Sequence, residues 1–131
     1  MNMPCRPWRA RALIASMVIV IGCGDAQPPA PADPSIARSA LLAALEAWKR
    51  GESAPVAREG APSIRVSDED WHFGSKLESF QIENREARRG ASLELSVILS
   101  LRNPKGKRST KRVTYEVLTD PEPIVIRQES N

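Results

Sequence analysis

The chain of 131 residues contains a single histidine, two cysteines and few aromatic side chains. A hydrolase with nucleophilic catalysis needs a serine, a histidine and an orienting acid within reach of one another. His72 is the only imidazole, and no such constellation surrounds it. The apolar segment at residues 12–21 has ten residues, about half of the roughly 20 that a membrane-spanning helix needs. The composition therefore argues against an enzyme and against a permanent single-pass span.

The N-terminal segment does contain the sequence pattern of an export signal. Three arginines precede the apolar segment, and no acidic residue occurs before Asp25. The segment closes on Val20-Ile21-Gly22-Cys23, which resembles the lipobox of bacterial lipoproteins. The resemblance implies cleavage between Gly22 and Cys23, with residues 1–22 as the signal peptide, and acylation of Cys23. Two or three acyl chains, such as palmitate, hold a protein stably at a membrane.

The resemblance also implies a location in the cell envelope. Gly24 follows the modified cysteine where aspartate would favour the inner membrane. We therefore expect anchoring to the bacterial outer membrane, with the domain on its periplasmic or surface face. The alternative is an ordinary secretory signal or an uncleaved anchor, in which Cys23 is incidental.

Removal of the signal peptide changes the charge and thiol content of the protein. Without Arg6, Arg9 and Arg11, 16 of the 19 basic residues remain, equal to the 16 acidic residues. The mature chain is then neutral, which removes the main argument for nucleic-acid binding. Cys5 is lost and Cys23 carries lipid, so the folded part holds no thiol for a disulfide, a zinc site or a nucleophile.

The remaining chain divides into a linker and one domain. Residues 23–34 hold the lipidated cysteine and a stretch with four prolines, which predicts an extended tether of up to roughly 30 Å. Residues 35–131 predict a single α+β domain. Its helix at residues 35–50 is capped by Asp33 and Pro34 and followed by Gly51. Its apolar face consists of Ala37, Leu41, Ala44, Leu45 and Trp48.

Alternating apolar residues predict the strands. The clearest is residues 91–102, followed by a turn at 103–106 and a second arm at 108–119. Shorter strands are expected at 64–67, at 76–86 with a hydrophilic hairpin end at 83–90, and at 124–126, where flanking prolines favour an edge. We expect one N-terminal amphipathic helix packed on a curved antiparallel sheet of four or five strands, similar in outline to cystatin-like domains and their cone-shaped relatives.

Three groups of residues are candidates for a site. Asp68, Glu69, Asp70 and His72 bring carboxylates and an imidazole together, but their spacing matches no known metal loop, so we interpret them as a solvated turn without metal or cofactor. A second group would line a pocket between helix and sheet for a small apolar or amphiphilic ligand, although packing of the core explains it better. Its members are Trp48, Trp71, His72, Phe80 and Tyr115.

The third group is basic and lies around the predicted turn. It would contact anionic headgroups, lipopolysaccharide phosphates or an acidic protein. The alternative is a charged strand end that resists aggregation. No aromatic side chains for base stacking are interleaved, so nucleic acid is not expected. The members are Lys105, Lys107, Arg108, Lys111 and Arg112.

These observations predict a lipid-anchored bacterial envelope protein with a non-enzymatic binding or scaffolding domain and an envelope protein as its partner. One alternative is a small-ligand-binding or minor enzymatic domain with a pocket between helix and sheet. Another is a subunit of an envelope complex that adds a partner strand to an exposed edge at residues 124–127.

Overall fold

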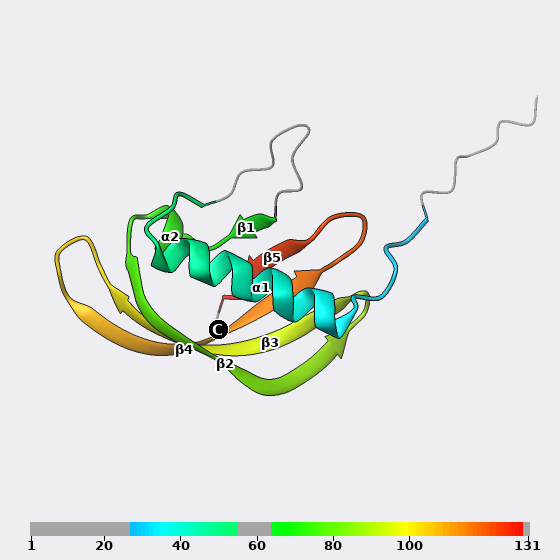
Figure 1. Ribbon diagram of the computed structural model, residues 1–131. Coiled ribbons are helices and arrows are strands. Elements are labelled where there is room, and N and C mark those ends of the chain that lie inside the picture. Colours follow the sequence, from blue (N-terminus) through cyan, green and yellow to red (C-terminus); the bar gives the residue numbers. More distant parts are fainter. Residues whose placement is uncertain (1–26, 55–63, 130–131) are drawn as a thin grey trace, which may run out of the picture.

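The computed structural model describes residues 27–54 and 64–129 (Figure 1). The expected signal peptide, its cleavage site at Gly22 and the lipidation site Cys23 lie outside these residues. The elements are α1 (Pro34–Lys49), β1 (Arg65–Ser67), α2 (Glu69–His72), β2 (Lys76–Arg89), β3 (Ser92–Arg102), β4 (Arg108–Leu118) and β5 (Ile124–Arg127). The α+β class is confirmed: α1 packs on one five-stranded sheet. None of the helices in the described parts is long and apolar enough to cross a membrane.

The sheet has the strand order β1-β5-β4-β3-β2. Strands β2 to β5 are antiparallel neighbours, whereas β1 pairs in parallel with β5 through Val66 and Val125. The expectation of a wholly antiparallel sheet is therefore wrong at β1. The expectation that β5 forms an edge is also wrong, because β5 lies between β1 and β4. The prolines permit this position because they precede the strand, and the carbonyl of Pro123 accepts a hydrogen bond from Arg65 N at 3.1 Å.

Helix α1 begins and ends where its capping residues predict. Asp33 Oδ1 accepts hydrogen bonds from Ser35 N at 2.9 Å and Ile36 N at 3.1 Å. At the other end Gly51 has φ +82°, its N–H donates to Trp48 O, and Glu52 N donates to Ala47 O. This pair of bonds is a Schellman motif, which requires the left-handed backbone that glycine adopts easily.

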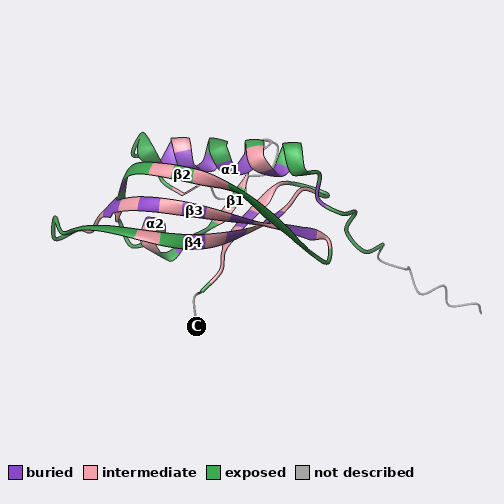
Figure 2. Cartoon of the chain, turned by 90° about the horizontal axis from the view of Figure 1, so that it is seen from below, coloured by how far each residue is buried: buried purple, intermediate pink, exposed green. Residues whose placement is uncertain are grey.

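The core lies between α1 and the concave side of the curved strands (Figures 1 and 2). Every second residue of β3 from Leu93 on is buried, and so are the three β4 residues paired with Leu93, Leu95 and Val97. The predicted alternation of β3 and the predicted face of α1 are both confirmed. Besides Ser92, the buried residues of these strands are Leu93, Leu95, Val97, Leu99, Leu101, Val113, Tyr115 and Val117.

Strand β2 is longer than the sequence pattern indicates. It continues to Arg89, and only Gly90 and Ala91 form the turn, so residues 83–89 of the expected hairpin end belong to the strand. Its polarity reflects its place at the edge of the sheet, where charged side chains contact α1 and the chain before it: Arg38 forms an ion pair with Glu86, and Arg88 Nη2 donates to Ala32 O at 3.0 Å.

The chain joins the domain earlier than the predicted tether boundary. Ala32 is buried, and its N–H donates to Ala91 O at 2.8 Å. Ala30 N donates to Asp120 Oδ2 at 2.8 Å, and Asp33 N donates to Thr119 Oγ1 at 3.2 Å. Residues 30–33 are therefore held at the end of the sheet that carries the β2–β3 and β4–β5 connections.

Candidate functional site

Asp68, the first acidic residue after β1, lies in the folded interior, whereas Asp70 is partly buried and Glu69 is exposed, so the expectation of a solvated turn is wrong for Asp68. Asp68 is the N-cap of α2, and its Oδ1 accepts a hydrogen bond from Trp71 N at 3.2 Å. Its side chain is only 1% exposed. A buried carboxylate needs partners that replace its hydration, and these partners come from β4 and β5.

The partners of Asp68 form a connected set of charged and polar groups. Tyr115 Oη donates to Asp68 Oδ2 at 2.5 Å, and Arg127 Nη1 donates to Asp68 Oδ1 at 3.1 Å. Arg127 also pairs with Asp70, whose Oδ2 accepts from Lys111 Nζ at 2.5 Å. We call Asp68, Asp70, Lys111, Tyr115 and Arg127 the Asp68 network. It joins α2 to β4 and β5.

The surroundings of this network shift the pKa values of its members. Burial raises the pKa of Tyr115 far above its ordinary value of 10, and the charge of Asp68 adds to the effect. Burial opposes the charged form of Arg127, but hydrogen bonding to Asp70 and the charge of Asp68 outweigh it and raise the pKa. Burial also opposes ionisation of Asp70, but hydrogen bonds from Lys111 and Arg127 prevail and lower its pKa. The network thus favours neutral tyrosine, arginine cation and Asp70 carboxylate.

The lowered pKa of Asp70 predicts a pH-dependent contribution to stability. A carboxyl with a depressed folded-state pKa stabilises the fold above its unfolded value, here 3.8, and this contribution is lost as pH falls through the folded-state pKa. Asp70→Asn should lower the free energy of unfolding at pH 7 by about 1 kcal/mol, because partial exposure screens the pairing. Urea unfolding from pH 7 to pH 2 should show this difference shrinking below about pH 4. A difference that stays constant with pH would contradict the assignment.

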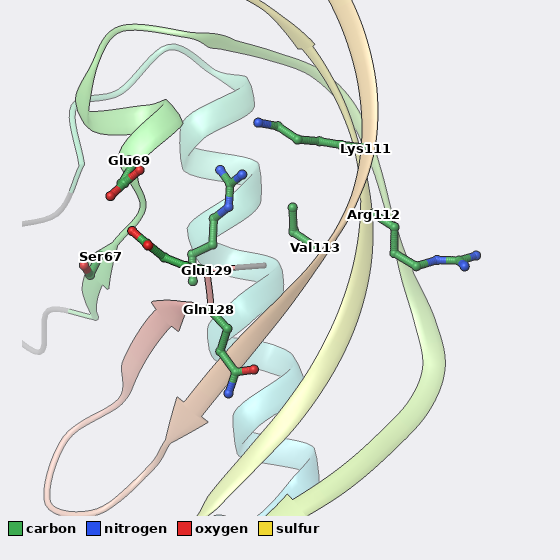
Figure 3. Close-up of a pocket in the computed structure, with 8 residues that line it drawn as sticks. Ser67, Glu69, Lys111, Arg112, Val113, Gln128 and Glu129 are labelled. Carbon is green, nitrogen blue, oxygen red and sulfur yellow. The ribbon is translucent and has the colours of Figure 1, made fainter. Parts of the chain in front are cut away.

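An open cavity of about 510 Å³ flanks the Asp68 network (Figure 3). Ser67, Glu69, Lys111, Val113, Arg127 and Glu129 are among the residues that line it. Glu69 and Glu129 point toward each other in the close-up, and the hydrogen bond and repulsion from Glu129 raise the pKa of Glu69. No group of three or more metal-ligating side chains occurs in residues 27–54 and 64–129. The cavity therefore offers a mixed-charge surface with two carboxylates near one another.

The aromatic candidates do not share one pocket. Trp48 and Trp71 stack with ring centroids 5.3 Å apart, and their indole N–H groups donate to Ser75 O at 2.8 Å and Glu52 O at 2.9 Å. Both rings are almost fully buried, yet their edges and His72 line an open cleft of about 520 Å³. Phe80 packs partly buried against the core, and Tyr115 belongs to the Asp68 network. The structure thus brings three of these five side chains to one cleft.

His72 lines this cleft and lies outside the Asp68 network. Its ring is exposed and meets the exposed ring of Phe73 edge to face, with centroids 5.5 Å apart. Asp68 and Asp70 are close to His72 in the sequence. Their carboxylates instead accept hydrogen bonds from Tyr115, Arg127 and Lys111. The predicted cluster of carboxylates and imidazole is therefore divided by the fold.

The basic candidates are divided as well. Arg108 contacts Glu78 at 3.3 Å, Lys111 contacts Asp70, and Arg112 contacts Glu83 at 2.7 Å. Lys111 and Arg112 point to opposite faces because they are adjacent in a strand, and Figure 3 shows Arg112 turned away from the cavity. Lys105 and Lys107 are exposed on the turn and pair with no acid in the part of the chain that the structure describes.

Arg127 is a member of the Asp68 network that the candidate groups in the sequence did not include, although its position in β5 carries a signal. Arg127 follows Val125 by two residues in β5, so the alternation of a strand puts both on the same face. Val125 is fully buried, and a guanidinium beside it must have an acidic partner. Asp68 and Asp70 were the available acids.

Comparison of the chain with family models, curated proteins and solved structures finds no match. The function must therefore be inferred from the residues themselves and from their arrangement.

Proposed function

We propose that this chain is a bacterial envelope lipoprotein, acylated at Cys23, whose α+β domain acts by binding an envelope partner and not by catalysis. The observation that carries the proposal is the lipobox-like sequence Val20-Ile21-Gly22-Cys23 a few residues before the folded domain. Among the described residues, the first hydrogen bond from the N-terminal segment to the domain is made by Ala30, seven residues after Cys23. An extended chain of this length spans roughly 22 Å, so the domain would stay near the lipid surface.

The position of this attachment supports a defined orientation. Residues 30–33 are held at the N-terminal end of α1, and a helix of 16 residues is about 24 Å long. The β3–β4 turn and α2 lie toward the opposite end of α1 (Figure 1). In an anchored protein this end would be the one held furthest from the anchoring leaflet and presented to partners.

The arrangement of the acidic residues favours binding over catalysis. A general acid or base needs a side chain that can reach a substrate. Asp68 is buried and holds Tyr115 and Arg127, and Asp70 holds Arg127 and Lys111. These groups connect three elements of the fold, which supports a structural role for them.

Metabolic labelling tests the lipid anchor. Cells that express the full chain are grown with a palmitate analogue, and the wild type is compared with Cys23→Ala. We expect label on the wild type only, and a mature N-terminus at Cys23 by mass spectrometry. Cys5→Ala is the matched control and should keep the label, because Cys5 precedes the cleavage site. Label retained in Cys23→Ala, or an unmodified N-terminus at Met1, would overturn the proposal.

A further inference from the structure

A second cleft lies at the end of the domain away from the tether. It has a volume of about 510 Å³ and runs between the end of α1, the start of β2 and the ends of β3 and β4 that meet at the turn. Its lining is dominated by basic side chains contributed by all four elements or their ends. These are Lys49, Arg50, Lys76, Arg102 and Arg108. We call this site the basic cleft.

The basic cleft holds more positive than negative charge. Glu78 is the one carboxylate that lines it, and Glu78 Oε1 is shared between Arg102 Nε at 2.8 Å and Arg108 Nε at 3.3 Å. Arg50 has its own partner, Glu52, at 3.2 Å. Among the described residues, Glu78 and Glu52 therefore offset two of the five positive charges. The excess of three positive charges has a local field that attracts anions.

The basic cleft also contains a buried hydrogen-bond donor without an acceptor among the described residues. Arg102 Nε lies close to Glu78 but makes no well-aligned hydrogen bond to any described residue. Each guanidinium carries five N–H donors in a planar fork. Arg102 and Arg108 share a single carboxylate oxygen, and neither has a second acidic partner among the described residues.

Stabilisation of α1 accounts for part of this charge only. Cations near the C-terminus of a helix offset its dipole, which explains Lys49 and Arg50. It does not explain Lys76, Arg102 and Arg108, which come from three strands and converge on the same cleft. A common anionic ligand gives one reason for all five.

We propose that the basic cleft binds a phosphomonoester group. Such a group carries up to two negative charges on three oxygens, which match the forks of several arginines better than a single carboxylate does. The cleft is open to solvent, so a charged phosphate group can reach its basic side chains. This inference deepens the binding role proposed above: it names the ligand class and rests on that role, while the lipid anchor is tested separately.

The ligand has two chemical sources, a soluble phosphorylated molecule or a phosphorylated lipid headgroup. The tether enters at the opposite end of α1, so an anchored domain would turn the basic cleft away from its own leaflet. A lipid ligand would therefore belong to a facing membrane. Titration with a soluble phosphomonoester and capture of separate vesicles distinguish the two sources.

Calorimetric titration of the full chain in neutral detergent with glycerol 3-phosphate tests the site. We expect saturable binding that is stronger than for sulfate at equal ionic strength. Arg102→Gln with Arg108→Gln should weaken it at least about tenfold, because two charge-assisted contacts are lost. Arg85→Gln with Arg89→Gln removes the same charge far from the cleft and should leave it unchanged. Glu78→Gln should strengthen binding severalfold, a gain that a misfolded variant cannot produce.

The second measurement uses the full chain in neutral vesicles and follows the capture of acceptor vesicles. Capture of acceptors with phosphatidic acid, competed by glycerol 3-phosphate, assigns the ligand to a lipid headgroup. Binding of glycerol 3-phosphate without capture assigns it to a soluble molecule, and both results support the basic cleft. Binding that is absent, equal for sulfate, or insensitive to the Arg102 and Arg108 substitutions overturns it. A wild-type protein that carries no palmitate label but binds glycerol 3-phosphate would overturn the anchor alone.

Discussion

Asp68→Ala should lower the free energy of unfolding by about 3–5 kcal/mol, the cost of removing one partner from a buried ion pair. The Asp68 carboxylate is almost fully enclosed and accepts hydrogen bonds from the Tyr115 hydroxyl, the Arg127 guanidinium and the Trp71 amide. The substitution leaves the hydroxyl and much of the guanidinium without an acceptor. It also removes the N-cap of α2. Chemical denaturation at pH 7, followed by tryptophan fluorescence, measures the loss.

Two controls separate this effect from the general cost of removing an acid. Glu122→Ala changes an exposed residue in the loop before β5 and should shift the free energy of unfolding by less than about 0.5 kcal/mol. Replacing Asp68, Tyr115 and Arg127 together by Leu, Phe and Met should recover much of the stability, because apolar packing often substitutes for a buried ion pair. An Asp68→Ala protein within about 1 kcal/mol of the wild type would contradict the role assigned to the Asp68 network.

Trp48→Ala is expected to cost about 3–5 kcal/mol, as for other large-to-small substitutions in a core. Trp48 is 3% exposed, stacks on Trp71 with an angle of 5° between the rings, and donates to Ser75 O. Its loss would leave a cavity between α1 and α2 and an unpartnered carbonyl. Domains of this size are stable by roughly 5–15 kcal/mol, so urea unfolding should show a large fall in the midpoint.

Leu42→Ala is the matched control on the same helix. Leu42 is 47% exposed on the solvent side of α1, so its substitution should change the free energy of unfolding by less than about 0.5 kcal/mol. Trp48→Phe keeps most of the packing and removes the indole donor, and should lie between the two, near 1 kcal/mol. If Trp48→Ala and Leu42→Ala gave equal losses, the stacked pair would not be the centre of packing at this end of the domain.

The elements that follow from the sequence are those with strong local signals. Helix α1 carries a cap at each end and an apolar face of 3.6 periodicity, and β3 alternates strictly at five buried positions. Each of these patterns lies within one continuous segment, so the helix and the strand can be predicted without knowing which other segments they contact. The turn from Asn103 to Gly106 was also predictable from its proline and glycine. In the structure Gly106 has φ +86°, and its N–H donates to Asn103 O at 2.9 Å.

The elements that do not follow depend on contacts between distant segments. The pairing of β1 with β5 joins residues about 59 positions apart, and three-residue strands carry too little alternation to specify a neighbour. The short helix α2 depends on Asp68, whose partners Tyr115 and Arg127 are 47 and 59 residues away. The basic cleft likewise collects side chains from separate elements, so a search for runs of lysine and arginine finds only the turn.

The central position of β5 also orders events during synthesis. The strand that holds β1 against the rest of the sheet, and that supplies Arg127 to the Asp68 network, follows all the other described elements in the chain. A chain emerging N-terminus first can form α1 and the β2–β3–β4 meander early, because these contacts are local. Closure around β1 and α2 must wait until β5 has emerged, because β5 supplies both the pairing partner of β1 and the arginine that binds Asp68.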